Sequence, residues 1–170
     1  MTHRTARRAA PGLVLSLAVA GCMAVSSAQG SAVAGGASPA STASREGAEQ
    51  RVAELVNRHR AARGCPALVW DDGAARVAAA HSRDMAARSY FSHTSPDGRS
   101  PFDRLDAAGI RWSTAAENIA QDPRGPDEVV RGWLASPGHR ANIENCTLTR
   151  HGVGVSGQLW THLFYTPAPR

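Results

Sequence analysis

The chain has 170 residues, with 5% aromatic residues, three cysteines and no lysine. After its first 22 residues, no apolar run approaches the roughly 20 residues that a membrane-spanning helix needs. The sequence has no internal repeat, no His-Glu-x-x-His zinc motif, no nucleophile elbow and no phosphate-binding glycine loop. The sequence therefore lacks the usual signatures of a solenoid, a zincin protease, an α/β-hydrolase and a P-loop enzyme, and we do not expect it to belong to these classes.

All basic side chains are arginines, and they form no cluster interleaved with aromatic residues. The formal net charge is +5, but Arg4, Arg7 and Arg8 lie in the N-terminal leader, and without these three the charge falls to +2. A nearly balanced surface gives no electrostatic reason to bind a polyanion. We therefore predict no nucleic-acid partner, despite the high pI.

The N-terminus has the pattern of an export signal. Residues 1–12 contain three arginines and no acid, and a short apolar run at 13–20 is followed by small residues. We predict a signal peptide over residues 1–22. Cys22, in the lipobox-like Val19-Ala20-Gly21-Cys22, is a candidate lipidation site, which would provide the only attachment to a membrane. Ser26-Ser27-Ala28 offers ordinary cleavage instead, and both alternatives stay open.

Residues 23–45 are mainly Ser, Ala and Gly, which cannot bury an apolar face, and are predicted to be a flexible tether. Residues 46–168 are predicted to form the folded domain. Cys65 and Cys146 are the cysteines that remain there. In an exported protein an even pair predicts a disulfide, and two separate buried thiols are the alternative.

The spacing of apolar residues differs between the first half of this domain and its last part. Its first half shows helical spacing, and its last part reads as two strands around a tight turn, so we predict an α+β fold. The expected elements are a helix over 46–63, a short apolar segment at 68–70, a helix from Asp71 or Asp72 to about Ser89, a loop at 90–100, short helices near 102–108 and 127–135, a turn or helix opening at His139, and strands at 152–157 and 159–165.

Several polar side chains stand where packing alone would not place them. His81 shares a helical stripe with Val77 and Met85, and it is either a buried structural histidine or a site residue. His93 opens a polar loop. Glu117 lies in an apolar run, so it needs a partner such as His93 or His139.

His139 follows a Pro-Gly break, from which a side chain can point into a cleft. The simpler alternatives are an exposed loop residue for His93, a structural ion pair or helix-start cap for Glu117, and a turn residue for His139. His59, His151 and His162 fit no such group and are predicted to be surface or structural residues.

Six short motifs follow one another along the chain, and each is weak alone. Together they resemble the CAP superfamily of cysteine-rich secretory, antigen 5 and pathogenesis-related proteins, in particular its bacterial branch with an SCP-like extracellular domain. The resemblance covers about residues 48–166. It is carried by Asn57-Arg58-His59-Arg60 with Gly64, His81-Ser82-Arg83-Asp84-Met85, Tyr90-Phe91-Ser92-His93-Thr94, Glu117-Asn118-Ile119-Ala120, Trp133 with Ser136-Pro137-Gly138-His139-Arg140-Ala141-Asn142-Ile143, and Gly152-Val153-Gly154-Val155.

This resemblance implies a three-layer α-β-α sandwich with a central antiparallel sheet. It also implies a cleft with two histidines and two glutamates that bind zinc or another divalent cation. His93, Glu117 and His139 match three of these four ligands. The second glutamate, expected shortly after Trp133, has no counterpart in residues 134–136. The remaining cleft-lining residues are expected to be His81, Asn118 and Ser136.

Two functions are consistent with these features. The first is an exported binding module, secreted or anchored outside the cell membrane, whose cleft holds a lipid, a small molecule or a fragment of the cell envelope. This reading needs no catalytic activity. The second is a metal-assisted hydrolase of peptide or peptidoglycan, in which Glu117 is the general base and His93 and His139 hold the metal.

Overall fold

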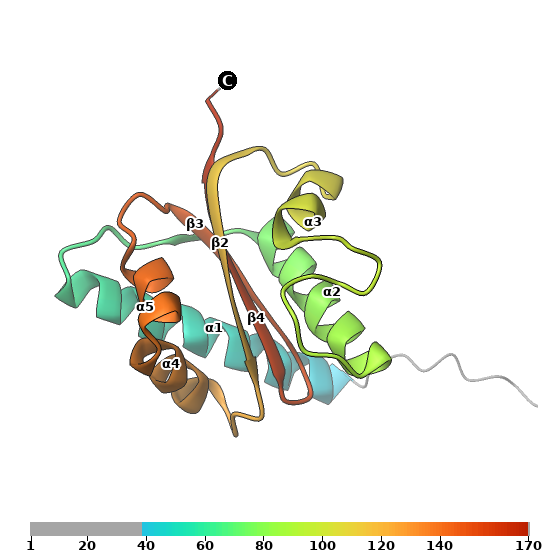
Figure 1. Cartoon of the computed structure of the whole chain (residues 1–170). Coiled ribbons are helices and arrows are strands. Elements are labelled where there is room, and N and C mark those ends of the chain that lie inside the picture. Colours follow the sequence, from blue (N-terminus) through green and yellow to red (C-terminus); the bar gives the residue numbers. More distant parts are fainter. Residues whose placement is uncertain (1–38, 170) are drawn as a thin grey trace, which may run out of the picture. The chain divides into compact units, whose positions relative to one another are not determined.

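The computed structural model describes residues 39–169, with side chains from residue 44. This part of the chain forms an α+β domain in which helices cover both faces of one sheet (Figure 1). The strand order is β1-β3-β4-β2, so β2 is an edge strand. The elements are α1 (Pro39–Ala62), β1 (Val69–Trp70), α2 (Asp72–Arg88), α3 (Pro101–Ala107), β2 (Trp112–Gln121), α4 (Pro126–Ala135), α5 (Pro137–Glu144), β3 (Arg150–Ser156) and β4 (Leu159–Pro167).

The three-layer architecture is confirmed, with two corrections. The three long strands are antiparallel, but the two-residue β1 pairs in parallel with β3, so the sheet is mixed. Helix α1 begins at Pro39, and residues 39–45 of the predicted tether are therefore helical. Proline suits a first helical turn, and the alanines that follow favour helix. The predicted leader at 1–22 and the tether residues 23–38 lie outside the described residues.

Helix α2 ends where its sequence signals predict. Asp71 is its N-cap and accepts a hydrogen bond from the backbone N–H of Ala74, and Ser89 closes the helix in the left-handed conformation. The stripe of Val77, His81 and Met85 is buried against the sheet. Between residues 39 and 169, no helix is long and apolar enough to cross a bilayer.

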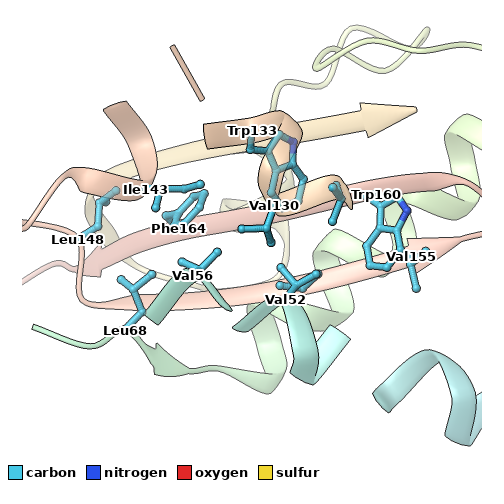
Figure 2. Packing of buried hydrophobic residues seen from close by; sticks show 12 residues of the cluster. Val52, Val56, Leu68, Val130, Trp133, Ile143, Leu148, Val155, Trp160 and Phe164 are labelled. Carbon is cyan, nitrogen blue, oxygen red and sulfur yellow. The ribbon is translucent and has the colours of Figure 1, made fainter. Parts of the chain in front are cut away.

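The main hydrophobic core lies between the sheet and the layer formed by α1, α4 and α5 (Figure 2). Trp133 of α4 is its largest fully buried side chain, and the indole N–H donates to the carbonyl of Ile119 on β2 at 3.0 Å. Because side chains alternate along a strand, β2 directs Ala116, Asn118 and Ala120 to this layer. Ala115 and Glu117 face the opposite layer, formed by α2 and α3.

That second layer packs closely because β3 carries glycine on the face toward α2. A Cβ atom on Gly154 would lie 2.0 Å from the backbone nitrogen of Ala79, and one on Gly152 would lie 2.1 Å from that of Ala75. Neither contact is sterically possible, so helix backbone rests directly on strand backbone. The spacing of α2 from the sheet, and with it the position of the following loop, depends on these glycines.

The predicted disulfide between Cys65 and Cys146 is confirmed, with Cα atoms 4.9 Å apart. It joins the end of α1 to the segment after α5. Beside it, the fully buried guanidinium of Arg60 acts as a structural connector, and burial lowers its pKa below the ordinary value. Its N–H groups donate to the carbonyls of Pro66, Ile143, Asn145 and Leu148.

A second polar contact in the core joins two histidines on neighbouring strands. His151 Nδ1 and His162 Nε2 lie 3.0 Å apart, and both residues are almost fully buried. Burial, reinforced by the charge of Arg60, lowers the pKa of His151 to about 4, and burial lowers the pKa of His162 as well. The pair is therefore neutral and structural, as predicted for these two residues.

Adding one methyl group at Gly154 should separate α2 from the sheet. We expect Gly154→Ala to lower the free energy of unfolding by at least about 3 kcal/mol, because backbone rather than a movable side chain obstructs the new Cβ. Gly132→Ala is the matched control in helix α4, where a Cβ meets nothing within 4 Å. It should be stabilising by roughly 0.5–1 kcal/mol. Urea unfolding measures both, and equal effects would contradict the close packing.

The histidine pair should make stability fall in mild acid. The unfolded chain binds protons below the ordinary histidine pKa of about 6.5, whereas the folded core excludes them until about pH 4 for His151. His151 alone should therefore lower the stability by roughly 3 kcal/mol between these pH values, and the lowered pKa of His162 should add to this loss and extend it to more acidic pH. Urea midpoints across this range, with NMR titration of both imidazoles, test this. Either imidazole titrating near pH 6.5 in the folded state would contradict it.

Candidate functional site

The candidate site lies where the two helical layers meet around the edge strand β2. Glu117 and Asn118 are neighbours in the middle of this strand, so their side chains point to opposite faces. Glu117 contacts the loop before α3 and α3 itself, and Asn118 contacts α5. One dipeptide thus joins both layers to the sheet.

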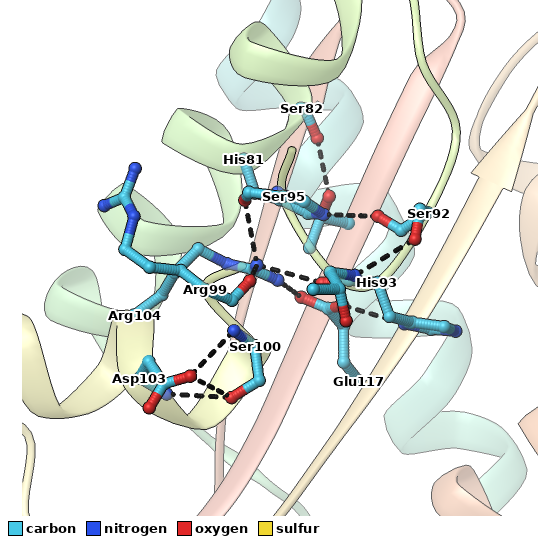
Figure 3. A network of polar contacts seen from close by, with 12 residues as sticks. His81, Ser82, Ser92, His93, Ser95, Arg99, Ser100, Asp103, Arg104 and Glu117 are labelled. Carbon is cyan, nitrogen blue, oxygen red and sulfur yellow. Dashed lines mark hydrogen bonds and ion pairs between the residues drawn. The ribbon is translucent and has the colours of Figure 1, made fainter. Parts of the chain in front are cut away.

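Both carboxylate oxygens of Glu117 are engaged. Oε1 lies 2.8 Å from Nδ1 of His93, and Oε2 accepts a hydrogen bond of 2.8 Å from the guanidinium of Arg104 (Figure 3). The Glu117 side chain is only 2% exposed, and that of Arg104 is 7% exposed. A buried carboxylate is tolerated when it is paired and fully hydrogen-bonded, and this one is.

This pairing orients His93. An ionised carboxylate only accepts hydrogen bonds, so the proton of the neutral imidazole is placed on Nδ1. Nε2 then carries a free lone pair. Since the His93 side chain is 48% exposed, that lone pair is available to a ligand. Glu117 therefore positions the imidazole of His93, and His93 is the residue that a ligand in the cavity would contact.

Arg104 holds the loop that carries His93 as well as the carboxylate. Its Nη1 donates to the carbonyls of His93 at 2.9 Å and Arg99 at 3.1 Å, and to the Ser95 hydroxyl at 3.3 Å. Helix α3 presents this side chain from a start capped by Ser100 and Asp103, which form a reciprocal capping box. The loop, the helix and the strand are therefore fixed by one guanidinium.

His81 lies behind this arrangement rather than in an open cleft. It is 1% exposed, and its Nε2 lies 3.0 Å from the carbonyl of Ser92, to which it donates. Burial lowers the pKa of His81, although the nearby charge of Glu117 acts in the opposite direction. The hydroxyl of Tyr90 donates to Asp84 at 2.6 Å and lies 3.5 Å from Nδ1 of His81. His81 thus supports the backbone next to His93.

Asparagine side chains organise the other half of the site. Asn118 is fully buried, and its amide donates to the backbone carbonyl of His139 at 3.1 Å. Asn142, one helical turn further along α5, donates to the Asn118 side-chain oxygen at 2.8 Å. Burial lowers the pKa of His139, and a proton added to the neighbouring His93 would lower it further. His139 is therefore an uncharged imidazole at neutral pH.

Two open cavities lie along β2 at these residues. The first has a volume of about 440 Å³ and is lined by His93, Glu117 and Asn142, together with the exposed ring of Phe102. The second, of about 390 Å³, is lined by His139 and Ser136 among others. The predicted site residues His93, Glu117, His139 and Ser136 therefore line these two cavities. His81 lines a separate, smaller cavity of about 180 Å³ beside Arg104, and Asn118 supports the site from the interior.

Comparison with known proteins agrees with this geometry. The model of the CAP family, described as the cysteine-rich secretory protein family, matches residues 53–159. The chain belongs to the CAP family. Two proteins of Bacillus subtilis are similar to it: YkwD is 44% identical over 118 residues, and the membrane protein YlbC is 39% identical over 116 residues. Each match covers 68% of this chain, but only 46% of YkwD and 34% of YlbC.

Solved structures show the same fold. An extracellular protein with an SCP domain from Bacillus anthracis is 36% identical, with a TM-score of 0.72, and the match covers 77% of this chain and 44% of that one. An outer surface protein of Borrelia burgdorferi matches with a TM-score of 0.65 at 19% identity, over 70% of this chain and 92% of that one. The latter likeness concerns the fold alone. The fold implied by the sequence motifs is thereby confirmed for this CAP domain.

The cation site implied by the resemblance can be compared with the donor atoms. Over the described part of the chain, no three His, Cys, Asp or Glu side chains converge as metal ligands. Each oxygen of Glu117 already accepts one hydrogen bond, from His93 and from Arg104, and the side chain is only 2% exposed. The set of His93, Glu117 and His139 as three direct ligands does not fit this CAP domain. The imidazoles of His93 and His139 remain as candidate ligands, and Glu117 contacts His93 from the interior.

The sequence analysis missed Arg104, Asn142 and the Tyr90–Asp84 pair. Arg104 shares a short helix with Leu105, and a buried glutamate needs a cation, but arginine is usually exposed and nothing in the spacing linked it to Glu117. Asn142 lay within the motif that contains His139 and was not singled out. Its role becomes visible only when α5 lies across β2.

Removing Arg104 should leave the Glu117 charge buried without its strongest partner. We expect Arg104→Ala to lower the free energy of unfolding by about 3–5 kcal/mol. Arg99→Ala is the matched control, because Arg99 and Asp97 form an equally short pair of 2.8 Å that is exposed to solvent. Its effect should be far smaller. Urea unfolding compares the two, and similar losses would show that burial of the Arg104–Glu117 pair is unimportant.

Proposed function

We propose that this chain is an exported CAP-domain binding protein that holds an extracellular ligand at His93 and His139. One observation supports this most strongly. Glu117 is 2% exposed with both oxygens engaged, while the His93 imidazole is 48% exposed. The carboxylate positions the imidazole, and the imidazole faces the cavity. The ligand classes that fit are a lipid, a small molecule or a cell-envelope fragment.

The same observation argues against hydrolysis with Glu117 as general base. A general base must lie within hydrogen-bond reach of the water it activates, and the Glu117 side chain is only 2% exposed. Freeing Oε2 would break a buried ion pair with Arg104, which is strongly unfavourable. Family likeness alone carries no activity. Binding is therefore the better supported function.

The imidazoles suit a divalent cation such as zinc. Neutral histidine nitrogen is a preferred zinc ligand, and a carboxylate behind a ligating histidine commonly orients it. His93 and His139 would hold the ion, and Glu117 would act through His93. When bound, the ion supplies a Lewis-acidic point of attachment for an oxygen or nitrogen of the ligand. Two protein ligands leave open positions for that atom.

Export is supported by the leader pattern at residues 1–22 and by the disulfide between Cys65 and Cys146, which persists in oxidising compartments. The similar protein from Bacillus anthracis is described as extracellular. Whether the chain is lipidated at Cys22 or cleaved after Ala28 is decided by mass spectrometry of the mature N-terminus.

Zinc titration of the full-length protein by calorimetry tests the cation. His93→Ala and His139→Ala should each abolish zinc binding, and Glu117→Gln should weaken it by roughly 10- to 100-fold. His59→Ala is the control, since His59 pairs with Glu144 at 2.8 Å outside both cavities. Zinc affinity that survives both cavity replacements, or no zinc binding at all, would remove the metal from the proposal.

Sedimentation with purified peptidoglycan and product release from peptidoglycan or casein separate binding from hydrolysis. We expect binding that His93→Ala and His139→Ala weaken, without soluble products. Product release that is lost in Glu117→Ala, while the protein stays folded, would make the chain a hydrolase. Peptidoglycan binding that is equal in all variants would place the ligand elsewhere.

A further inference from the structure

A third cavity, of about 450 Å³, lies at the C-terminal end of β2, beyond the buried Glu117–Arg104 pair. The end of α2, the loop after it, the end of β2 and the turn between β3 and β4 enclose it. Its lining includes Met85, Ser89, Phe91, Gln121, Asp122 and Gln158. A volume of this size falls within the range of small-molecule sites. No part of the site described above explains its composition.

Its backbone is strained at two positions. Ser89 and Asp122 have φ values of 52° and 68°, and they are the two non-glycine residues with positive φ in the described range. At its other positive-φ positions, including Gly98 and Gly157, that range uses glycine, which adopts this conformation without a steric penalty. Ser89 adopts this conformation because it closes helix α2, so Asp122 is the position at which a strained backbone marks a candidate site. Both strained residues line this one cavity.

Four of its polar side chains are exposed and unengaged. Within residues 44–169, the side chains of Ser89, Gln121, Asp122 and Gln158 take part in none of the hydrogen bonds or ion pairs that join other residues. Two amides, a hydroxyl and a carboxylate together offer donors and acceptors in several directions. A ligand with several hydroxyl groups both donates and accepts hydrogen bonds, so it could pair with the donors and with the acceptors.

The cavity also has an apolar surface. Phe91 is 46% exposed, which is unusual for so large an apolar side chain, and Met85 is fully buried beneath. The face of an aromatic ring carries partial negative charge and attracts polarised C–H groups. A pyranose ring presents such a C–H face, with hydroxyls around its edge.

Charge excludes other ligands. No arginine or histidine lines the cavity, although the chain has 19 basic residues, all arginine. An anionic ligand would therefore meet only the carboxylate of Asp122. We propose that this cavity is a saccharide-binding site, in which Phe91 stacks on a sugar ring and Gln121, Gln158 and Ser89 bind its hydroxyl groups.

The site is distinct from the one at His93 and His139. It shares Gln121 and Asp122 with the cavity beside His139, whereas Phe91 and Gln158 belong to it alone among these cavities. The two sites adjoin at the end of β2. The inference does not rest on the proposed function, because no residue of the His93–Glu117–Arg104 group takes part.

NMR titration of the isotope-labelled full-length protein tests this with three neutral trisaccharides: N-acetylglucosamine trimer, cellotriose and mannotriose. At least one should shift the amide signals of residues 89–91, 121–122 and 156–158. Phe91→Ala should weaken its binding at least about tenfold, and Gln158→Ala about fivefold. Phe102→Ala, which removes an exposed ring in another cavity, is the control and should leave the affinity unchanged.

Two further variants separate the alternatives. His139→Ala should leave saccharide affinity unchanged even where it abolishes zinc binding. Asp122→Asn should also retain it, because an amide replaces the carboxylate as a hydrogen-bond partner. Choline binding that Asp122→Asn removes, without saccharide binding, would make this a site for organic cations and overturn the proposal. Absence of shifts with all three trisaccharides, or binding unaffected by Phe91→Ala, would overturn it as well.

Discussion

The candidate site depends on a buried carboxylate that is fully paired. Glu117 is excluded from water, and its charge is tolerated because Arg104 compensates it and His93 donates a hydrogen bond to it, each at 2.8 Å. The same two contacts fix the loop before α3 and set the orientation of an exposed imidazole. The contacts of Glu117 with Arg104 and His93 therefore both stabilise the fold and position the candidate binding residues.

The sheet makes this arrangement possible. Alternation along β2 directs Glu117 to one helical layer and Asn118 to the other, so two adjacent residues organise groups from opposite sides of the domain. Gly152 and Gly154 allow α2 to rest on the sheet, which places the loop containing His93 beside the strand edge. Arg60 and the disulfide of Cys65 hold the segment that follows α5. Precise positioning at the edge thus relies on close packing in the interior.

Much of the fold was predictable from local signals. The signals for helical spacing, the Asp71 cap and the Gly-rich hairpin each lie within a few residues of one another in the sequence. The disulfide was predictable because two cysteines remain in the domain. The parallel pairing of β1 was not predictable, since a two-residue strand carries no periodicity.

At the site, His93 and Glu117 were identified because a histidine opening a loop and an acid in an apolar run are unusual. Arg104 was missed because its role arises from tertiary contacts 13 residues apart in the chain. The same contacts explain why Glu117 does not fit as a direct metal ligand.

The tautomer of His93 tests this account most directly, and the nitrogen chemical shifts of its imidazole report it at neutral pH. The account predicts a proton on Nδ1 that is donated to Glu117, and a ring whose proton lies on Nε2 alone would contradict it.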